Sequence, residues 1–378
     1  MNFDELKAYY KDKRVLITGH TGFKGSWLCA ILILMGAEVS GYSLKPPVEG
    51  GLFDIVFGDG AGDDSREDLP LFGRGMGRDE LKLRRSHIGD IRNFDELKAF
   101  YEEVKPHYVF HLAAQPIVRD SYRIPRETYE TNVMGTVNLL ECVRLGHKPI
   151  SLLNVTTDKV YKNEERSDYA YMEEDKLDGF DPYSNSKSCS ELVTHGYKSS
   201  FFETDGPAVS TARAGNVIGG GDMANDRIIP DCVRAATKGE KIFIRNPLSI
   251  RPYQHVLEPL AVYLEICALS GKDRAYEGWY NVGPDEADCV TTGELADMFI
   301  EAWGEGAAKE CGKNPEGPHE ANFLKLDNSK IKKVFSWRPV WPVNKAVSET
   351  VAWSKALIKG KDMANAEMER QIREFFHS

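Results

Sequence analysis

Short apolar runs alternate with helical patterns through the first half of the chain, and this alternation is what most constrains its fold. The four runs cover residues 15–18, 38–43, 108–113 and 150–155. Runs of this length, bounded by turn or helix signals, are typical of parallel strands buried on both faces. Between them, residues 26–35 and 94–103 have helical patterns, and Gly36 follows the first pattern where glycine commonly ends a helix. We therefore predict an α/β protein with a doubly wound parallel sheet.

The second half of the chain differs in texture, with more proline, arginine and tryptophan and a weaker alternation after about Gly215. We predict a Rossmann-type nucleotide-binding domain over residues 1–215, with returns near 250–282, and a smaller C-terminal α/β substrate domain over residues 216–378. Segment 49–78 is rich in glycine and acids and interrupts the first half. We interpret it as a solvated insertion, with a lid over the nucleotide site as the alternative.

Composition excludes several classes of function. The 378-residue chain has a formal net charge of −10, which disfavours nucleic-acid binding because phosphate recognition needs a basic face. The longest strongly apolar stretch, residues 27–37, is far shorter than the roughly 20 residues that cross a bilayer. Seven scattered cysteines without a C-x-x-C pattern favour reduced thiols over disulfides or a zinc site. We expect a cytoplasmic protein with no metal, nucleic-acid or membrane partner.

A glycine-rich turn follows the first predicted strand and opens a helix. It reads Gly19-His20-Thr21-Gly22-Phe23-Lys24-Gly25, with glycines at intervals of three. Because glycine has no side chain to stand in the way, the backbone N–H groups and the positive end of the helix meet a pyrophosphate directly. The turn therefore predicts a dinucleotide site, with a glycine turn that only packs strand on helix as the alternative.

Two further positions bear on the type of dinucleotide. The second predicted strand is followed by Leu44 and Lys45 rather than by the acid that commonly binds the adenosine ribose, and Lys45 suits a 2′-phosphate. This motif alone therefore leaves NAD and NADP open. After a third candidate strand, Asp90 offers a carboxylate to an adenine amino group, and a turn-forming aspartate is the equal alternative.

Tyr183 and Lys187 lie one turn apart at the start of a predicted helix, which Asp181 caps and Pro182 opens. A lysine ammonium and an oxidised nicotinamide near the phenol would lower the pKa of the tyrosine from about 10 toward neutrality. Such a phenol exchanges a proton with a sugar hydroxyl. The Tyr-x-x-x-Lys spacing occurs twice earlier in the chain, but neither copy follows a strand that ends in Ser or Thr.

Thr157, Asp158 and Lys159 stand at the end of the fourth predicted strand, about one helix length of chain before Tyr183. The run puts an acid and a possible base beside the hydride-transfer pair, which indicates a second reaction in addition to alcohol oxidation. A surface salt bridge between neighbours is the alternative. For Asp158 to act as an acid near neutral pH its pKa must rise, which burial favours and a charged Lys159 opposes. The sequence leaves open which of the two holds the proton.

Several segments together carry a resemblance to a known family. The glycine turn, residues 110–116 (FHLAAQP), residues 131–136 (TNVMGT) and residues 183–187 resemble the extended short-chain dehydrogenase/reductases that act on nucleotide sugars. More narrowly, the segments similar to the 4,6-dehydratases of CDP-glucose are residues 157–159, 181–187, 213–222 and 250–256. The similarity extends from about residue 13 to about residue 353, interrupted by segment 49–78.

The resemblance implies a task for each member of the charged run. In these dehydratases NAD takes a hydride from C4 of the hexose, water is lost across C5 and C6, and the hydride returns to C6. Tyr183 with Lys187 is assigned to the oxidation, Thr157 to a place near O4, Asp158 to the acid at C6 and Lys159 to the base at C5. Related epimerases have small or neutral residues at the two charged positions. Dehydratases of dTDP-glucose have Glu in place of Lys159, so the lysine favours CDP-glucose.

The resemblance also implies a set of contacts to cofactor and substrate. The residues expected to contact NAD are Gly19, Thr21, Gly22, Phe23, Gly25, Asp90, Ile91, Leu112, Ala113, Ala114, Gln115, Thr156, Tyr183 and Lys187. Arg227 and Arg251 are expected along the substrate diphosphate, because guanidinium groups suit phosphate oxygens, and Asn216 is expected at its inner end. Arg245 lies in the same stretch, and His319 is a weak candidate near the base, with a surface histidine as the stronger alternative.

We therefore expect an NAD-dependent hydro-lyase that converts CDP-glucose to CDP-4-dehydro-6-deoxyglucose, for deoxysugars of surface polysaccharides such as the O-antigen of lipopolysaccharide. The alternatives are a dehydratase or 4-epimerase of another nucleotide sugar, and a non-catalytic NAD(P)-sensing protein of the same fold. Sensing relatives typically lose the tyrosine and lysine pair, which is intact here. The resemblance further implies a homodimer or homotetramer that pairs through two long helices flanking the sheet.

Overall fold

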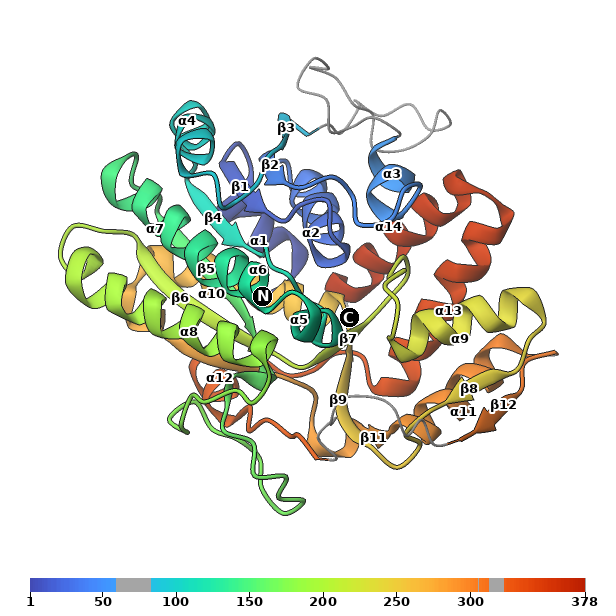
Figure 1. Ribbon diagram of the computed structural model, residues 1–378. Coiled ribbons are helices and arrows are strands. Elements are labelled where there is room, and N and C mark those ends of the chain that lie inside the picture. Colours follow the sequence, from blue (N-terminus) through green and yellow to red (C-terminus); the bar gives the residue numbers. More distant parts are fainter. Residues whose placement is uncertain (59–82, 305, 313–322, 378) are drawn as a thin grey trace.

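The computed structural model describes residues 1–58, 83–304, 306–312 and 323–377. A seven-stranded parallel sheet forms its centre, in the order β10-β6-β5-β4-β1-β2-β3 (Figure 1). Its strands are β1 (Arg14–Thr18), β2 (Glu38–Ser43), β3 (Arg85–Ile88), β4 (Tyr108–His111), β5 (Ser151–Thr157), β6 (Ala208–Ala214) and β10 (Trp279–Val282). The strand order reverses between β1 and β4, which is where doubly wound sheets bind ligands. The predicted fold class is confirmed.

Helices cover both faces of this sheet (Figure 1). One face packs against α1 (Phe3–Tyr10), α2 (Phe23–Leu34) and α10 (Leu257–Lys272), and the other against α4 (Phe94–Val104), α7 (Gly135–Leu145) and α8 (Pro182–Tyr197). Alternate residues of β1 divide between two cores, with Val15 and Ile17 in the first and Leu16 in the second. Successive side chains of a strand point to opposite faces, so a strand buried on both sides must be apolar throughout.

The ends of the predicted elements differ from the structure by a few residues, and the differences affect the site. β5 continues to Thr157, two residues beyond the predicted end, and a short 3₁₀ turn, η2 (Asp158–Val160), follows it. α2 begins at Phe23 rather than Ser26, because the extended backbone of Gly22 places the cap inside the glycine turn. β4 ends at His111, which leaves the residues after it free to form the floor of a cleft.

A second body of structure lies beyond the carboxyl ends of the strands (Figure 1). Its strands form two small sheets, in the orders β11-β9-β7 and β12-β8. They are β7 (Asn216–Ile218), β8 (Ile242–Ile244), β9 (Ile250–His255), β11 (Cys289–Thr291) and β12 (Lys309–Cys311). With α9 (Ile228–Lys238), α11 (Thr292–Trp303) and α13 (Val343–Lys359) they enclose a separate hydrophobic core. The chain returns from this body to the main sheet at α10 and β10.

The last helices tie the two bodies together. α12 (Ser329–Phe335) packs against β10, and α14 (Lys361–His377) packs against α13, α1 and α3 (Leu52–Phe57). The position of the boundary between the two domains, at residue 215, stays a prediction. Of the segment 49–78, residues from 59 onward lie outside the described residues, as does His319.

Two negative findings apply to the described part of the chain. No helix there has both the length and the apolar character needed to cross a membrane. Within the same residues, no group of three or more His, Cys, Asp or Glu side chains is arranged to hold a metal ion.

Candidate active site

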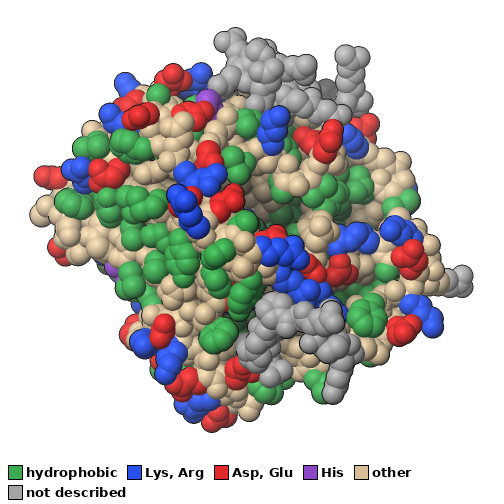
Figure 2. Space-filling view, viewed as in Figure 1, with side chains coloured by type: hydrophobic (Ala, Val, Ile, Leu, Met, Phe, Trp, Pro, Cys, Tyr) green, Lys and Arg blue, Asp and Glu red, His purple; other side chains and the backbone are tan. Residues whose placement is uncertain are grey.

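A cleft of about 1520 Å³ opens between the carboxyl ends of the central strands and the second body, and the surface is hollowed there (Figure 2). Most of the predicted site residues line it. They are Gly19, Thr21, Gly22, Phe23, Gly25, Asp90, Ile91, Leu112, Ala113, Ala114, Thr156, Thr157, Lys159, Tyr183, Lys187, Asn216, Arg227 and Arg251. Asp158 and Gln115 do not belong to the lining. The structure thus gathers segments from both halves of the chain, although the individual roles of these residues stay predictions.

The glycine turn is shaped as a cradle for a pyrophosphate. Gly19 has a positive φ of 79°, and a Cβ built on it would lie 2.7 Å from the backbone nitrogen of Ala113. A Cβ on Gly25 would lie 2.2 Å from the carbonyl oxygen of Gly19. Gly22 is the N-cap of α2. A Cβ built on it would have only the carbonyl oxygen of Gly19 nearby, so Gly22 faces open space in the cleft. Tight packing behind and open space in front are what a dinucleotide needs from this turn, so the residues fit NAD.

The adenosine end of the cleft is formed by β2 and by the loop after β3. The hydroxyl of Thr21 donates to the carbonyl oxygen of Leu44 at 2.9 Å, which fixes the chain after β2 against the glycine turn. Asp90 accepts a hydrogen bond from Arg92 at 2.6 Å, and that contact lowers the pKa of its carboxyl. Asp90 therefore stands charged at the cleft edge.

Tyr183 and Lys187 lie on the first turns of α8, as predicted. Asp181 caps this helix by accepting a hydrogen bond from the backbone of Ser184 at 3.0 Å, and Pro182 is its first residue. Burial lowers the pKa of Lys187 to about 8, and its ammonium donates to the carbonyl oxygen of Val155 at 3.1 Å. The Lys187 side chain is thereby held against the end of β5.

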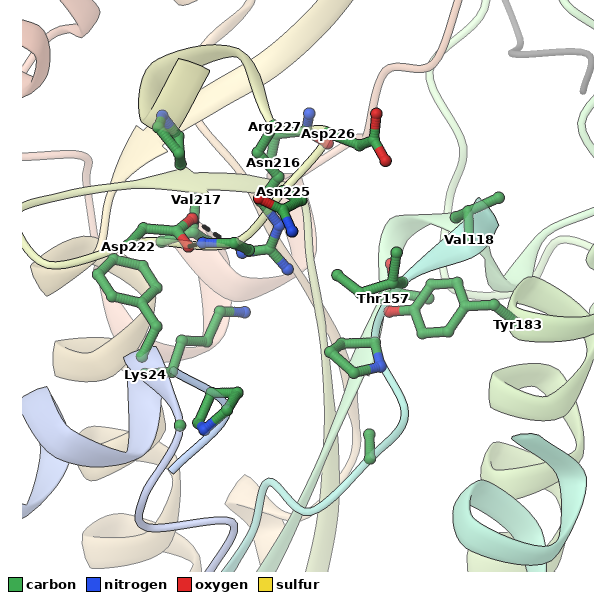
Figure 3. A pocket seen from close by; sticks show the side chains of 18 of the residues that line it. Lys24, Val118, Thr157, Tyr183, Asn216, Val217, Asp222, Asn225, Asp226 and Arg227 are labelled. Carbon is green, nitrogen blue, oxygen red and sulfur yellow. Dashed lines mark hydrogen bonds and ion pairs between the residues drawn. The ribbon is translucent and has the colours of Figure 1, made fainter. Parts of the chain in front are cut away.

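The phenol oxygen of Tyr183 lies beside the Thr157 side chain (Figure 3). Burial raises the pKa of Tyr183 to about 12, although a hydrogen bond with Thr157 acts in the opposite direction. The protein alone therefore keeps the phenol protonated. The predicted drop toward neutrality requires a further positive charge, such as the oxidised nicotinamide that the sequence analysis invoked.

Asp158 and Lys159 form a pair at the start of η2, but only the lysine reaches the cleft. Asp158 is fully buried, and its Oδ1 accepts hydrogen bonds from the Thr157 hydroxyl at 2.9 Å and from Lys159 Nζ at 3.0 Å. Lys159 Nζ also donates to Asn216 Oδ1 at 3.3 Å, which bridges the two bodies of the molecule. The carboxylate turns inward because the 3₁₀ turn directs it under the strand end, and sequence spacing carries no signal of that direction.

Gln115 lies behind the cleft wall and takes part in a buttress that the sequence analysis did not identify. Its backbone N–H donates to Asn132 Oδ1 at 2.8 Å, and its side-chain amide donates to the carbonyl oxygen of Ile117 at 3.1 Å. Asn132 in turn donates to the hydroxyl of Ser186 at 2.8 Å. The loop after β4 is thus fastened to the helix that carries Tyr183. The sequence signal for this contact was the segment 131–136, because Asn132 is the one buried amide side chain in it.

A buried ion pair supports the same helix from beneath. Glu191, one turn after Lys187, accepts hydrogen bonds from Thr211 at 2.7 Å, from Arg213 at 3.0 Å and from the hydroxyl of Thr156. Burial alone would raise the pKa of Glu191, but Arg213 and these hydrogen bonds outweigh it and lower the pKa to about 2. The pair joins α8 to the neighbouring strands β5 and β6. A carboxylate four residues after Lys187 was visible in the sequence as a same-face neighbour.

Arginines gather on the wall that the second body contributes. Arg227 pairs with Asp222 at 2.9 Å, and both point into the cleft from the loop before α9 (Figure 3). Nearer the mouth, Asp226 accepts from Arg245 at 2.6 Å and lies 3.5 Å from Arg119. Arg119 comes from α5 (Val118–Arg123), so this ion pair links the two sides of the mouth. Such a cluster of guanidinium groups is suited to phosphate oxygens.

Comparison with known proteins identifies relatives of this chain. The NAD dependent epimerase/dehydratase family matches residues 15–283. The CDP-glucose 4,6-dehydratase of Salmonella typhimurium is 44% identical over 366 residues, which cover 94% of each chain. Among solved structures, the UDP-glucose 4-epimerase of Stenotrophomonas maltophila with bound NAD has a TM-score of 0.74 at 18% identity, covering 92% of this chain and 99% of that one. The dTDP-glucose 4,6-dehydratase of Bacillus anthracis in complex with NAD has a TM-score of 0.70 at 22% identity, with coverages of 92% and 99%.

This chain belongs to the NAD-dependent epimerase/dehydratase family. The family resemblance inferred from its motifs is therefore confirmed, and the solved structures confirm the doubly wound fold. The match to the Salmonella enzyme extends over nearly the whole chain, including the second body that follows the family segment.

Proposed function

We propose that this chain is a CDP-glucose 4,6-dehydratase that uses and regenerates NAD. The observation that carries the proposal is the meeting of Tyr183, Lys187 and Lys159 at one cleft, with the buried Asp158 carboxylate 3.0 Å behind the Lys159 amine. Tyr183 with Lys187 suits oxidation and reduction of a carbinol, and Lys159 with Asp158 adds the proton transfers that an elimination requires. The identity of 44% over 94% of the chain to a CDP-glucose 4,6-dehydratase supports the same substrate.

The residues that would hold NAD are those of the glycine turn, the loop after β4 and the strand end at Thr156. NAD, when bound, accepts the C4 hydride and later returns it to C6. The protein's own share begins with the O4 proton. Tyr183 takes that proton, with the Thr157 hydroxyl as its hydrogen-bond partner and Lys187 as the nearby cation on the same helix. Removing the proton from O4 drives the departure of the hydride.

Lys159 acts next, because a ketone at C4 makes the C5 hydrogen acidic. Its amine lines the cleft and is the base that takes this proton. Asp158 does not reach the cleft, so we propose that it acts through Lys159 rather than directly on the C6 hydroxyl as first expected. A carboxylate 3.0 Å from the amine accepts its proton and returns it, so that Lys159 serves as base at C5 and then delivers a proton to the leaving hydroxyl.

Incubation of the purified protein with CDP-, dTDP-, UDP- and GDP-glucose tests the function. We expect a 4-dehydro-6-deoxy product from CDP-glucose, with no net consumption of NAD. The product is followed by mass loss of one water and by the carbonyl signal of the keto sugar. Absence of product from all four sugars, in protein that contains bound NAD, would contradict the enzyme assignment. Product from another sugar alone would overturn the choice of CDP-glucose.

Replacement of Lys159 with methionine is expected to separate oxidation from elimination. Without the amine, the ketone at C4 forms but the C5 hydrogen is no longer removed, so turnover falls by about 10²–10⁴-fold. In D₂O, the wild-type product acquires deuterium at C5 and the variant does not exchange it. Lys162→Met is the matched control, because Lys162 lies three residues away and is paired at the surface with Glu164 at 3.1 Å. Normal turnover in Lys159→Met would remove this lysine from the mechanism.

We further propose that two copies pair through the outer faces of α7 and α8. Hydrophobic side chains gather over this face (Figure 2). Leu145 of α7, Leu192 of α8 and Phe201 in the turn after α8 are each more than half exposed, at 52%, 56% and 51%. Pairing would cover apolar area that a lone chain leaves in water. We expect Leu192→Asp to shift the protein toward the monomer in sedimentation experiments. Ile358→Asp, at a 59% exposed position on α13, should leave the assembly unchanged, and a monomeric wild type would refute the pairing.

A further inference from the structure

Lys24 is the one charged side chain of the glycine turn. It lies half-buried near the start of α2 and lines the cleft. Among the described residues its ammonium makes no hydrogen bond or ion pair, and its recorded contact is the ring of Tyr263, whose centroid lies 6.0 Å away. A half-buried ammonium that lines a cleft and has no protein acceptor is open to an anionic ligand.

The surroundings of Lys24 are mostly positive. The charged groups that act on it are Arg227 from the loop before α9, Lys187 from α8, and Asp158 and Lys159 from η2. Burial lowers the pKa of Lys24 to about 7, the three cations lower it as well, and Asp158 is the one charge that opposes them. Asp222 already pairs with Arg227 at 2.9 Å. The cleft therefore concentrates positive charge around a lysine whose charged form a bound anion would stabilise.

The proposed function would bring two anions to this cleft, the pyrophosphate of the dinucleotide and the diphosphate of the nucleotide sugar. The backbone of the glycine turn is available to the first. The Lys24 side chain leads away from that turn, and its amino group points toward the side where Arg227 stands (Figure 3). Among the cations that lower the pKa of Lys24, Arg227 also has the largest effect. This direction favours the diphosphate of the sugar nucleotide over that of the cofactor.

We propose that Lys24 binds the diphosphate of the nucleotide sugar from the wall opposite Arg227, so that the two cations hold it between them and set the sugar against Tyr183. The proposal rests on the proposed function, because it takes a nucleotide sugar as the ligand. It adds a substrate contact to a turn whose other members serve the dinucleotide. It also makes substrate affinity depend on the protonation of Lys24.

The direction of that dependence follows from the charges. A bound diphosphate raises the pKa of Lys24 above its value of about 7 in the free protein. Below pH 7 the lysine is already charged and binding is strongest. Above pH 7 binding must be accompanied by uptake of a proton, so affinity falls as pH rises, until the pKa of the complex is reached.

The test is calorimetric titration of CDP into the NAD-loaded protein between pH 6 and pH 9. We expect Lys24→Met to weaken CDP binding by roughly 10–100-fold at pH 6.5, as loss of a charge-assisted phosphate contact predicts. The variant should also lose the part of the pH dependence that lies above pH 7. Lys24→Arg should keep the affinity and hold it up to pH 9, because arginine stays charged there. Lys272→Met, an exposed lysine at the end of α10, is the control and should bind as wild type.

Each other outcome is decisive. If the bound fraction of NAD falls in Lys24→Met and CDP affinity does not, the lysine serves the cofactor pyrophosphate and the proposal is overturned. Unchanged binding of both ligands overturns it too. UDP, dTDP and GDP are titrated in parallel, so that a failure of the substrate assignment is seen separately. If CDP binds no better than UDP, dTDP and GDP, the assignment of CDP-glucose as substrate fails. The proposal for Lys24 then stands only if Lys24→Met weakens the binding of whichever nucleotide binds best. Retained NAD content shows that each variant is folded.

Discussion

Replacement of Tyr183 with phenylalanine is expected to lower kcat by about 10²–10⁴-fold, which is the usual contribution of a positioned acid–base group. Phenylalanine keeps the half-buried ring and removes only the hydroxyl that faces Thr157. The O4 proton then has no acceptor in the cleft, so C4 is not oxidised and neither elimination nor reduction can follow. Single-turnover absorbance at 340 nm, the band of reduced nicotinamide, should show no transient, while the amount of bound NAD stays that of the wild type.

The chain offers a matched control for this variant. Tyr9 has the same four-residue spacing to a lysine, but it lies on α1 and is not among the residues that line the cleft. Tyr9→Phe should therefore leave kcat unchanged. A kcat within threefold of wild type in Tyr183→Phe would show that another group takes the O4 proton and would remove this tyrosine from its assigned role.

The main sheet could be predicted because its central strands are apolar throughout. The prediction found β1, β2, β4 and β5 to within two residues at each end. A third candidate strand was expected before Asp90, and β3 lies there, but the sequence set no bounds for it because RSHI holds three polar residues and stands at the sheet edge after segment 49–78. Its pairing with β2 comes from tertiary contact rather than from local pattern.

The candidate site was predictable where chemistry needs a specific residue type at a fixed spacing. The glycine turn and the Tyr183 helix are local motifs with local signals, including the cap at Asp181. The direction of the Asp158 side chain depends on a 3₁₀ turn whose geometry no spacing rule contains. The role of Glu191 on α8 likewise depends on Arg213, which lies on strand β6 and 22 residues away. Long-range partners of this kind become visible only in the folded chain.

Loss of the Glu191 carboxylate is expected to be the most destabilising single change in the described core. Glu191→Ala leaves the Arg213 guanidinium without the carboxylate of its ion pair, and Arg213 is only 1% exposed. Breaking a buried pair by removing one member typically costs about 3–5 kcal/mol. The hydroxyls of Thr156 and Thr211 lose their acceptor as well. The free energy of unfolding in urea measures the effect, and kcat should fall with it because Thr156 and Lys187 lose their support.

The same pair should give a signature in the pH dependence of stability. The pKa of Glu191 is lowered to about 2 in the folded protein from an ordinary 4.5, so its contribution is complete above about pH 4.5 and is lost as pH falls toward 2. Glu191→Gln should flatten the stability curve over that interval. A double variant, Glu191→Leu with Arg213→Met, should lose less than the sum of its single changes, because two apolar side chains of similar volume leave no buried charge unpaired. Additive losses would show that the two residues stabilise the protein independently, and the ion pair would then be incidental to the support of α8.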